Sequence, residues 1–186
     1  LSFYAATKRS NEVMAHAYSH LFKIPVTGLR FFTVYGPWGR PDMALFKFTK
    51  AILEDQPIDI YNNGKMKRDF TYIDDIVEGV AKAGKSPPSI SLGASEDSSD
   101  KSPVAPYRIY NIGNSAPVDL MDYVHAIEKA LNKKAVYVML PLQPGDVPAT
   151  YADTTALQQD FSYCPQTSVA DGVARFVAWY RDFYNV

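Results

Sequence analysis

The chain has 186 residues, of which 47% are hydrophobic, and its 19 basic and 20 acidic side chains leave a net charge of −1. This balance excludes a whole-chain electrostatic attraction to nucleic acid or to an anionic membrane, so an anionic ligand would need locally placed cations. The single cysteine, Cys164, excludes an intrachain disulfide and favours a reducing compartment such as the cytoplasm. We expect neither a membrane span, which needs roughly 20 apolar residues, nor a signal peptide.

The beginning of the chain predicts a helix that leads into a buried strand. Within residues 4–22, Val13, Ala17 and Leu21 recur at helical spacing, so we expect the helix to bury this face. Residues 26–35 form a β-type hydrophobic run. A helix followed by such a strand is the unit of a parallel sheet and indicates an α/β fold.

The rest of the chain predicts further helices and strands around one irregular segment. Asn63-Gly64 predicts a β-hairpin between strands at 58–61 and 69–73, and Asp74 or Asp75 can cap the helix that follows. Residues 85–106 are rich in Pro and Ser and indicate a flexible insertion. The other expected elements are helices at 44–55 and 119–132, a short helix after Asp153, strands at 107–112 and 135–140, and a last helix capped by Ser168 that buries Val173, Phe176, Val177 and Tyr180.

Tyr4 and Lys8 are the first candidates for chemistry, because spacing i, i+4 places both side chains on one helix face. An ammonium beside a phenol, together with a bound cationic nicotinamide ring, would lower the tyrosine pKa from about 10 toward neutrality. A tyrosinate near neutral pH can take a hydroxyl proton while a hydride leaves the same carbon. The spacing alone is more typical of two solvated helix residues.

Two other clusters favour ordinary surface roles. His16 and His20 are also spaced i, i+4, but no acidic or cysteine third ligand is evident, so we expect no metal site. Lys65, Lys67 and Arg68 lie near aromatic residues, yet the cluster is short and the chain is near neutral, which argues against nucleic-acid binding.

Five ordered motifs resemble the extended short-chain dehydrogenase/reductase family over essentially the whole chain. They are Tyr4-Ala-Ala-Thr-Lys8, Leu29-Arg30-Phe31-Phe32-Thr33-Val34-Tyr35-Gly36-Pro37, Arg68-Asp69-Phe70-Thr71-Tyr72-Ile73-Asp74-Asp75, Tyr110-Asn111-Ile112-Gly113, and Pro144-Gly145-Asp146 with Ala152-Asp153. The resemblance implies the C-terminal half of an NAD-binding Rossmann (doubly wound) fold with a small α/β substrate-binding domain. Residues 1–36 would be the last helix and strand of the NAD-binding domain. Residues 37–186 would form mainly the substrate-binding domain, with strands returning to the main sheet.

The stretch Phe32-Thr33-Val34-Tyr35-Gly36-Pro37-Trp38-Gly39-Arg40-Pro41-Asp42-Met43-Ala44 is similar to UDP-glucuronate 4-epimerases. Many relatives carry Asn where Thr33 stands. The Thr33 hydroxyl and the Arg40 guanidinium would suit a substrate with a carboxylate. Without the motif, Arg40 would be an ordinary loop cation.

The resemblance further implies residues that bind the nucleotide part of a UDP-sugar. Arg68 would contact the diphosphate through its fork of donors, and Asp146 would accept from a ribose hydroxyl. Tyr61 would pack on the uracil ring, although it could equally be a plain strand aromatic. Gln143 stands where many relatives have an Arg, so the phosphates would depend more on Arg68.

On the cofactor side, the resemblance implies NAD, with Tyr4 as general base, Lys8 on the nicotinamide ribose and Phe31 beside the nicotinamide. The implied reaction oxidises the sugar at C4, rotates the 4-keto intermediate and returns the hydride to the other face. UDP-glucuronate would become UDP-galacturonate, in the cytoplasm and in a full-length homodimer.

The G-x-x-G-x-x-G phosphate loop expected at a strand–helix junction does not occur in these residues. We therefore expect the chain alone neither to bind NAD well nor to turn over. Three alternatives remain open: a UDP-glucuronate decarboxylase, a nucleotide-sugar 4,6-dehydratase, and a non-catalytic module that binds nucleotide sugars.

Overall fold

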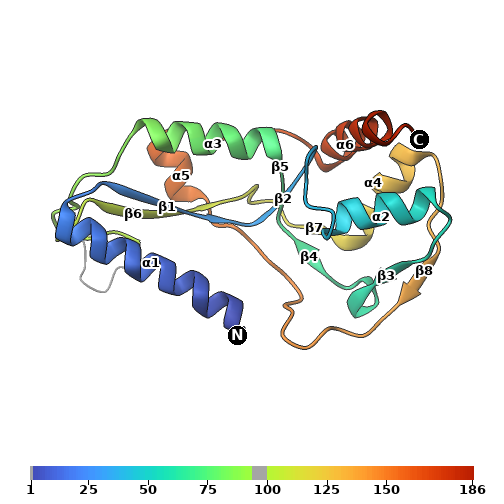
Figure 1. Cartoon of the computed structure of the whole chain (residues 1–186), viewed down its shortest axis with the longest axis horizontal. Coiled ribbons are helices and arrows are strands. Elements are labelled where there is room, and N and C mark those ends of the chain that lie inside the picture. The colour runs from blue at the N-terminus through green and yellow to red at the C-terminus, as the bar shows by residue number, and fades with distance from the viewer. Residues whose placement is uncertain (1, 94–99) are drawn as a thin grey trace. The chain divides into compact units, whose positions relative to one another are not determined.

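The computed structural model describes residues 2–93 and 100–186, which form two compact units (Figure 1). The first unit contains the chain up to Phe31 together with Val77–Ile112 and Asp153–Tyr163. The second unit contains Phe32–Ile76, Gly113–Ala152 and Cys164–Val186. Each unit is therefore assembled from segments that are distant in the sequence.

The first unit is built on two parallel strands. Strand β1 (Val26–Phe31) pairs with β6 (Tyr107–Ile112) from Val26↔Tyr107 to Phe31↔Ile112. The unit also contains α1 (Phe3–Phe22), α5 (Thr155–Phe161) and most of α3 (Ile73–Lys85). Gly79 of α3 allows close packing, because a Cβ at this position would lie 2.7 Å from Ile112 Cδ1. This confirms the predicted helix-to-strand order.

Helix α1 is confirmed, with Ser2 as its N-cap, but its predicted buried face is wrong. Val13 is 61% exposed and Leu21 is 69% exposed. The buried residue is instead Ser19, whose hydroxyl donates to the carbonyl of Pro106 at 3.2 Å, and His16 Nε2 lies 2.9 Å from Ser102 Oγ. The inner face of α1 is thus mixed, since Ala15 packs against Ala105, Tyr107 and Ile109 beside these hydrogen bonds. Periodicity identified an apolar stripe that this unit leaves exposed.

The second unit holds the larger hydrophobic core. Its elements are α2 (Ala44–Leu53), α4 (Leu120–Leu131), α6 (Val169–Tyr184), the 3₁₀ turn η1 (Tyr61–Gly64), and the strand pairs β2 (Thr33–Tyr35) with β5 (Phe70–Tyr72), β3 (Ile58–Ile60) with β8 (Tyr137–Met139), and β4 (Lys67–Arg68) with β7 (Val118–Asp119). The first two pairs are parallel and the third is antiparallel. The predicted single strand at 26–35 is thus divided at Phe32 into β1 and β2.

Helix α6 behaves as its sequence predicts. Val173, Phe176, Val177 and Tyr180 are buried, and Ser168 accepts a hydrogen bond from the Asp171 amide at 3.1 Å. Gly172 lies so close to Tyr35 that a Cβ there would be 2.3 Å from the phenol oxygen. A stripe of apolar side chains with a capping serine therefore located this helix and its inner face.

The predicted hairpin is wrong. Strand β3 pairs with β8 rather than with the strand near Phe70, and Asn63 N donates to Leu140 O at 3.0 Å. Asn62 and Asn63 have φ values of 52° and 50°, so the Asn-Gly signal marks left-handed backbone in η1. Such a signal predicts a turn but does not determine which strand follows it in the sheet.

The predicted cap at Asp74 or Asp75 is also wrong, because α3 begins at Ile73 and both carboxylates lie in its first turn. Asp75 instead accepts the amides of Gln166 at 3.3 Å and Thr167 at 3.1 Å. The remaining expected helices and strands are present with boundaries shifted by a few residues. Within the expected insertion at 85–106, residues 94–99 lie outside the described part of the chain.

Candidate active site

Tyr4 and Lys8 occupy one face of α1. Lys8 Nζ lies 5.5 Å from the centroid of the Tyr4 ring, and the tyrosine is 69% exposed. The first turn is ordered by Ser2, whose hydroxyl accepts from the Ala5 amide at 3.1 Å. The phenol and the ammonium are thus close to each other and open to a ligand.

These two side chains line a cavity of about 620 Å³ within the first unit. The cavity extends along α1 and β1, and Phe31, at the end of β1, belongs to its lining. The structure therefore brings together the three residues that the sequence assigned to the cofactor side. A phenol, an ammonium and an aromatic ring around one concave surface suit a ligand with hydroxyls and a flat ring.

An ion pair in the same cavity was not found from the sequence. Arg30 Nε donates to Glu12 Oε1 at 2.6 Å and Arg30 Nη2 donates to Glu12 Oε2 at 3.0 Å. The hydrogen bonds from Arg30 lower the pKa of Glu12, and Arg9 also pairs with this carboxylate. Glu12 follows Lys8 by one helical turn, which was the only available signal. Its charge is compensated by cations other than Lys8.

In the second unit, Arg68 and Asp146 form the centre of the expected nucleotide-binding group. Arg68 Nη2 donates to Asp146 Oδ1 at 2.8 Å, and the arginine side chain is only 17% exposed. The Asp146 amide donates to the carbonyl of Gln143 at 3.1 Å, which places Gln143 in the same loop. Three of the six expected substrate residues are therefore neighbours.

The other three expected substrate residues have separate surroundings. Thr33 is half-buried in β2, where its amide donates to Asp69 O at 3.3 Å, and Tyr61 packs partly buried against the core of the unit. Arg40 is exposed and its Nε donates to Asp42 Oδ1 at 3.0 Å. This hydrogen bond is the main cause of the lowered pKa of Asp42.

A buried carboxylate adjoins Arg68 in the sequence. Asp69 has no exposed surface, and its two oxygens accept from Asn114 N at 2.7 Å and Ala152 N at 3.0 Å. Since its hydrogen bonds go to backbone amides, Asp69 fixes the positions of two loops rather than contacting a ligand. Asp69 lies between β4 and β5, where its carboxylate is buried, whereas the Arg68 side chain at the end of β4 is partly exposed.

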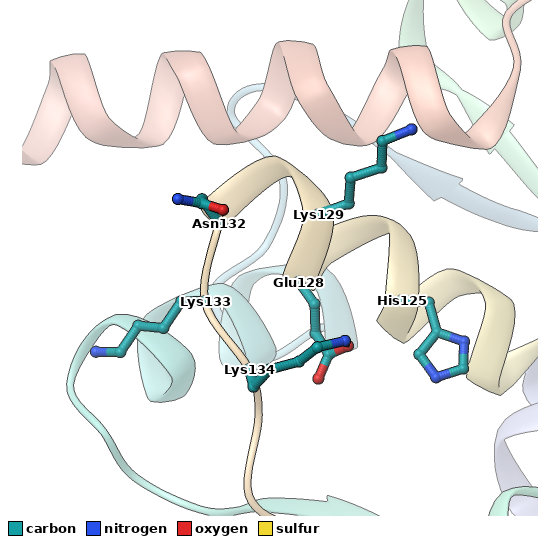
Figure 2. A pocket seen from close by; sticks show the side chains of 6 residues that line it. All are labelled: His125, Glu128, Lys129, Asn132, Lys133 and Lys134. Carbon is teal, nitrogen blue, oxygen red and sulfur yellow. The ribbon is translucent and has the colours of Figure 1, made fainter.

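A smaller hollow of about 320 Å³ lies at the end of α4 (Figure 2). Lys134 points toward the carboxylate of Glu128 and bonds it at 2.9 Å, whereas Lys133 points away and pairs with Asp55 at 2.9 Å. Both lysines thus have carboxylate partners within the chain. The hollow is explained by the packing of this helix end and does not join the expected site residues.

A family model described as "NAD dependent epimerase/dehydratase family" matches residues 1–113. This match spans more than half of the chain and includes Tyr4, Lys8, Arg40 and Arg68. The chain belongs to this family.

Named relatives of the epimerase/dehydratase family match along the whole chain. A probable UDP-glucuronate 4-epimerase of Rhizobium meliloti (strain 1021) is 53% identical over 187 residues, covering 100% of this chain and 55% of the relative. The crystal structure of UDP-glucuronic acid 4-epimerase from Bacillus cereus with UDP-glucuronic acid and NAD matches with 34% identity and a TM-score of 0.83, covering 99% of this chain and 54% of that one. The chain thus spans about half the length of these family members, corresponding to their C-terminal part.

More distant solved structures show the fold alone. A dTDP-glucose 4,6-dehydratase from Streptomyces venezuelae, DesIV, matches with a TM-score of 0.81 at 23% identity. The expected α/β class with a Rossmann-like relationship is confirmed by these likenesses. Among the described residues, no helix has the length and apolar character to cross a membrane, and no three His, Cys, Asp or Glu side chains gather as metal ligands.

Proposed function

We propose that the chain is the C-terminal part of an NAD-dependent epimerase that converts UDP-glucuronate to UDP-galacturonate through a 4-keto intermediate. The observation that carries this proposal is the Tyr4–Lys8 pair, open on one helix face in a cavity that also contains Phe31. The relatives named UDP-glucuronate 4-epimerases support the choice of sugar, since they match the chain from end to end.

The residues of the cavity fit the nicotinamide end of NAD. When bound, NAD supplies the hydride acceptor and donor for the sugar carbon. Tyr4 takes the proton from the C4 hydroxyl, and the neighbouring Lys8 ammonium stabilises the resulting phenolate while holding ribose hydroxyls. Phe31 offers a flat apolar surface beside the ring. The Glu12–Arg30 pair keeps its own charges compensated within the same cavity.

Arg68, Asp146, Gln143 and Tyr61 bind the UDP part in this proposal. Asp146 holds the Arg68 guanidinium in one orientation, so two or more of its remaining donors can face phosphate oxygens. Asp146 keeps a second oxygen that can accept from a ribose hydroxyl, Gln143 donates from the same loop, and Tyr61 packs on uracil. Thr33 and Arg40 recognise the sugar carboxylate.

The reaction is tested with a full-length protein carrying this chain, supplied with NAD and UDP-glucuronate, with products identified by NMR. We expect UDP-galacturonate, and we expect Tyr4→Phe to lower kcat by about 10²- to 10⁴-fold because it removes the proton acceptor. The matched control is Tyr18→Phe, an exposed tyrosine on the same helix. Formation of UDP-xylose would instead identify a decarboxylase, and a stable 4-keto product would identify a dehydratase.

We propose further that the 186-residue chain alone binds UDP but neither binds NAD well nor turns over. The supporting observation is that all six expected substrate residues lie in the unit with the larger core. Separate titrations of UDP and NAD test this, and epimerisation by the isolated chain would refute it. A full-length protein that also binds UDP without NAD would be the non-catalytic module.

For the full-length enzyme we propose a homodimer in the cytoplasm. The single cysteine supports a reducing compartment, and the exposed apolar side chains of α1 offer a surface for a second copy to cover. Light scattering of the full-length protein gives the mass, and a monomer at micromolar concentration would contradict the dimer.

A further inference from the structure

The loop between β2 and α2 carries an unusual residue two positions before Arg40. Trp38 has φ 62°, a left-handed backbone conformation that is strained for any residue other than glycine. Its side chain is nevertheless 75% exposed, so burial in the core does not account for the strain. The turns of this loop are closed by Gly39 N to Gly36 O and by Met43 N to Arg40 O, each at 3.1 Å.

Two aromatic residues of α6 hold Trp38 in place. Its ring centroid lies 5.3 Å from that of Trp179 and 5.1 Å from that of Phe183. Trp179 and Phe183 are one helical turn apart and stack on each other at 5.4 Å, so they present one continuous aromatic face. Contacts of this kind stabilise beyond simple burial, which offsets the backbone strain at Trp38.

The helix that supplies this face is firmly anchored. Val173, Phe176 and Tyr180 are buried in the core of the same unit, so α6 is a rigid support for the loop. Arg40 is in turn oriented by its two hydrogen bonds to Asp42. The aromatic contacts thus fix the backbone on one side of Arg40, and Asp42 fixes the guanidinium on the other.

We propose that Trp38, Trp179 and Phe183 are positioning residues that set the preference of this site for a sugar carrying a carboxylate. An arginine on a free loop loses affinity when the loop and side chain must be ordered on binding, whereas a pre-positioned fork does not. The aromatic contacts therefore lower the ordering cost at Arg40 and have no direct part in binding uridine or phosphate. The inference rests on the proposed function.

The preference is measured as the ratio of the dissociation constants of UDP-glucose and UDP-glucuronate, by calorimetry on a full-length protein carrying this chain. For the unaltered protein we expect UDP-glucuronate to bind at least about tenfold more tightly, because only its carboxylate can pair with Arg40. We expect Phe183→Ala and Trp38→Ala to bring the ratio within about threefold of one. The affinity for UDP alone should stay within about twofold, and KM for UDP-glucuronate should rise while kcat is retained.

Two variants separate positioning from general destabilisation. Trp38→Phe keeps an aromatic ring against α6 and should retain most of the preference. Tyr184→Ala removes a ring of the same helix that is 44% exposed, close to the 48% of Phe183. Tyr184 contacts Phe183 at 5.0 Å, but its removal leaves the rings of Trp179 and Phe183 against Trp38, so the ratio should stay close to that of the unaltered protein. Because Phe183 is on the surface, its variant remains informative if Trp38→Ala fails to fold.

The outcomes distinguish the two proposals. If the unaltered protein shows no preference for UDP-glucuronate, the proposed substrate is wrong and the inference fails with it. If the preference exists but Phe183→Ala leaves it intact, or if Phe183→Ala weakens UDP and UDP-glucuronate equally, the proposed function stands and the positioning role is wrong.

Discussion

Asp69 and Arg68 are adjacent in the sequence, but Asp69 bonds backbone amides inside the unit whereas Arg68 pairs with another side chain. Both belong to one motif of the sequence, which identified Arg68 as a ligand contact and assigned nothing to Asp69. In the structure Asp69 is fully buried and accepts the amides of Asn114 and Ala152, while Arg68 pairs with Asp146 near the surface. The assignment of Arg68 to a ligand stays a prediction, and the structure adds a structural role for Asp69. The two amides that donate to Asp69 belong to residues 45 and 83 positions away in the sequence, so no local sequence pattern predicts these hydrogen bonds.

Replacing Asp69 with Asn should lower the free energy of unfolding by about 2–3 kcal/mol, because one of two charge-assisted acceptors becomes an amide donor facing a backbone N–H. Urea denaturation of the 186-residue chain measures the loss. The neighbouring Arg68→Ala is the matched control and should cost clearly less than Asp69→Asn, because it removes an ion pair with the 36% exposed Asp146 and leaves the fully buried carboxylate in place. Equal losses of unfolding free energy in the two variants would contradict a mainly structural role for Asp69.

Arg68→Lys should weaken UDP binding about tenfold while keeping the charge, because lysine cannot offer the planar fork that Asp146 orients. Calorimetric titration of UDP into the 186-residue chain gives the affinity. Lys67→Ala serves as the control, since Lys67 is an exposed neighbour paired with Asp119 at 3.3 Å, and it should leave the affinity within about twofold. Arg68→Lys binding UDP as well as the unaltered chain would remove Arg68 from the phosphate site.

At the scale of elements, predictions succeeded where one segment determines its own structure. Helix α6 has a capping serine and an apolar stripe that its own unit buries, and both were predicted. Predictions failed where the structure of a segment depends on the segment that packs against it. Asn63-Gly64 forms a turn but no hairpin, and the apolar stripe of α1 that contains Val13 is exposed. Sheet pairing and the choice of buried face depend on residues far along the chain, which periodicity does not contain.

The end of α4 illustrates such a long-range role in Glu128, which is 3% exposed. Its carboxylate accepts from Lys134 Nζ at 2.9 Å, and Figure 2 shows these two side chains together. It also accepts from Ala135 N at 2.9 Å and from Tyr137 OH at 2.7 Å, and so fixes the start of β8 to the helix. Burial alone would raise the pKa of Glu128, but these hydrogen bonds outweigh it and lower the pKa below 4.5. The same burial and hydrogen bond raise the pKa of Tyr137 to about 12.

Glu128→Gln should therefore reduce the free energy of unfolding by about 1–3 kcal/mol at neutral pH. A lowered carboxylate pKa contributes stability above the ordinary value of 4.5, and this part disappears as the pH falls through the lower folded value. The difference between the unaltered chain and the variant should thus shrink below pH 4.5 in urea denaturation. Glu54→Gln, at an exposed glutamate of the same unit, should show no such difference. If the difference in unfolding free energy between the unaltered chain and Glu128→Gln did not change with pH, the Glu128 charge would not be what stabilises the fold.

At the scale of the whole molecule, α1 of the first unit buries much less of its apolar surface than α4 and α6 of the second. The second unit encloses an extended core from α2, α4, α6 and several strands, whereas the cluster against which Ala15 of α1 packs consists of Ala105, Tyr107 and Ile109. In the first unit, α1 leaves Phe3, Val13 and Leu21 more than half exposed. Local opening costs little where few apolar contacts must be broken, so α1, which carries the catalytic candidates, should open more easily than the helices of the larger core.

Hydrogen exchange measured by mass spectrometry on the 186-residue chain should show this difference. We expect the amides in the middle of α1 to exchange at least about tenfold faster than those of α4 and α6, which close on the larger core. The matched comparison is a full-length protein, in which the second copy of the proposed homodimer would cover the exposed face of α1. Protection of α1 should then rise while that of α4 stays unchanged. Equal protection of α1 and α4 in the 186-residue chain would contradict this. The contacts of α1 within its own unit would then be enough to stabilise the helix that carries Tyr4 and Lys8.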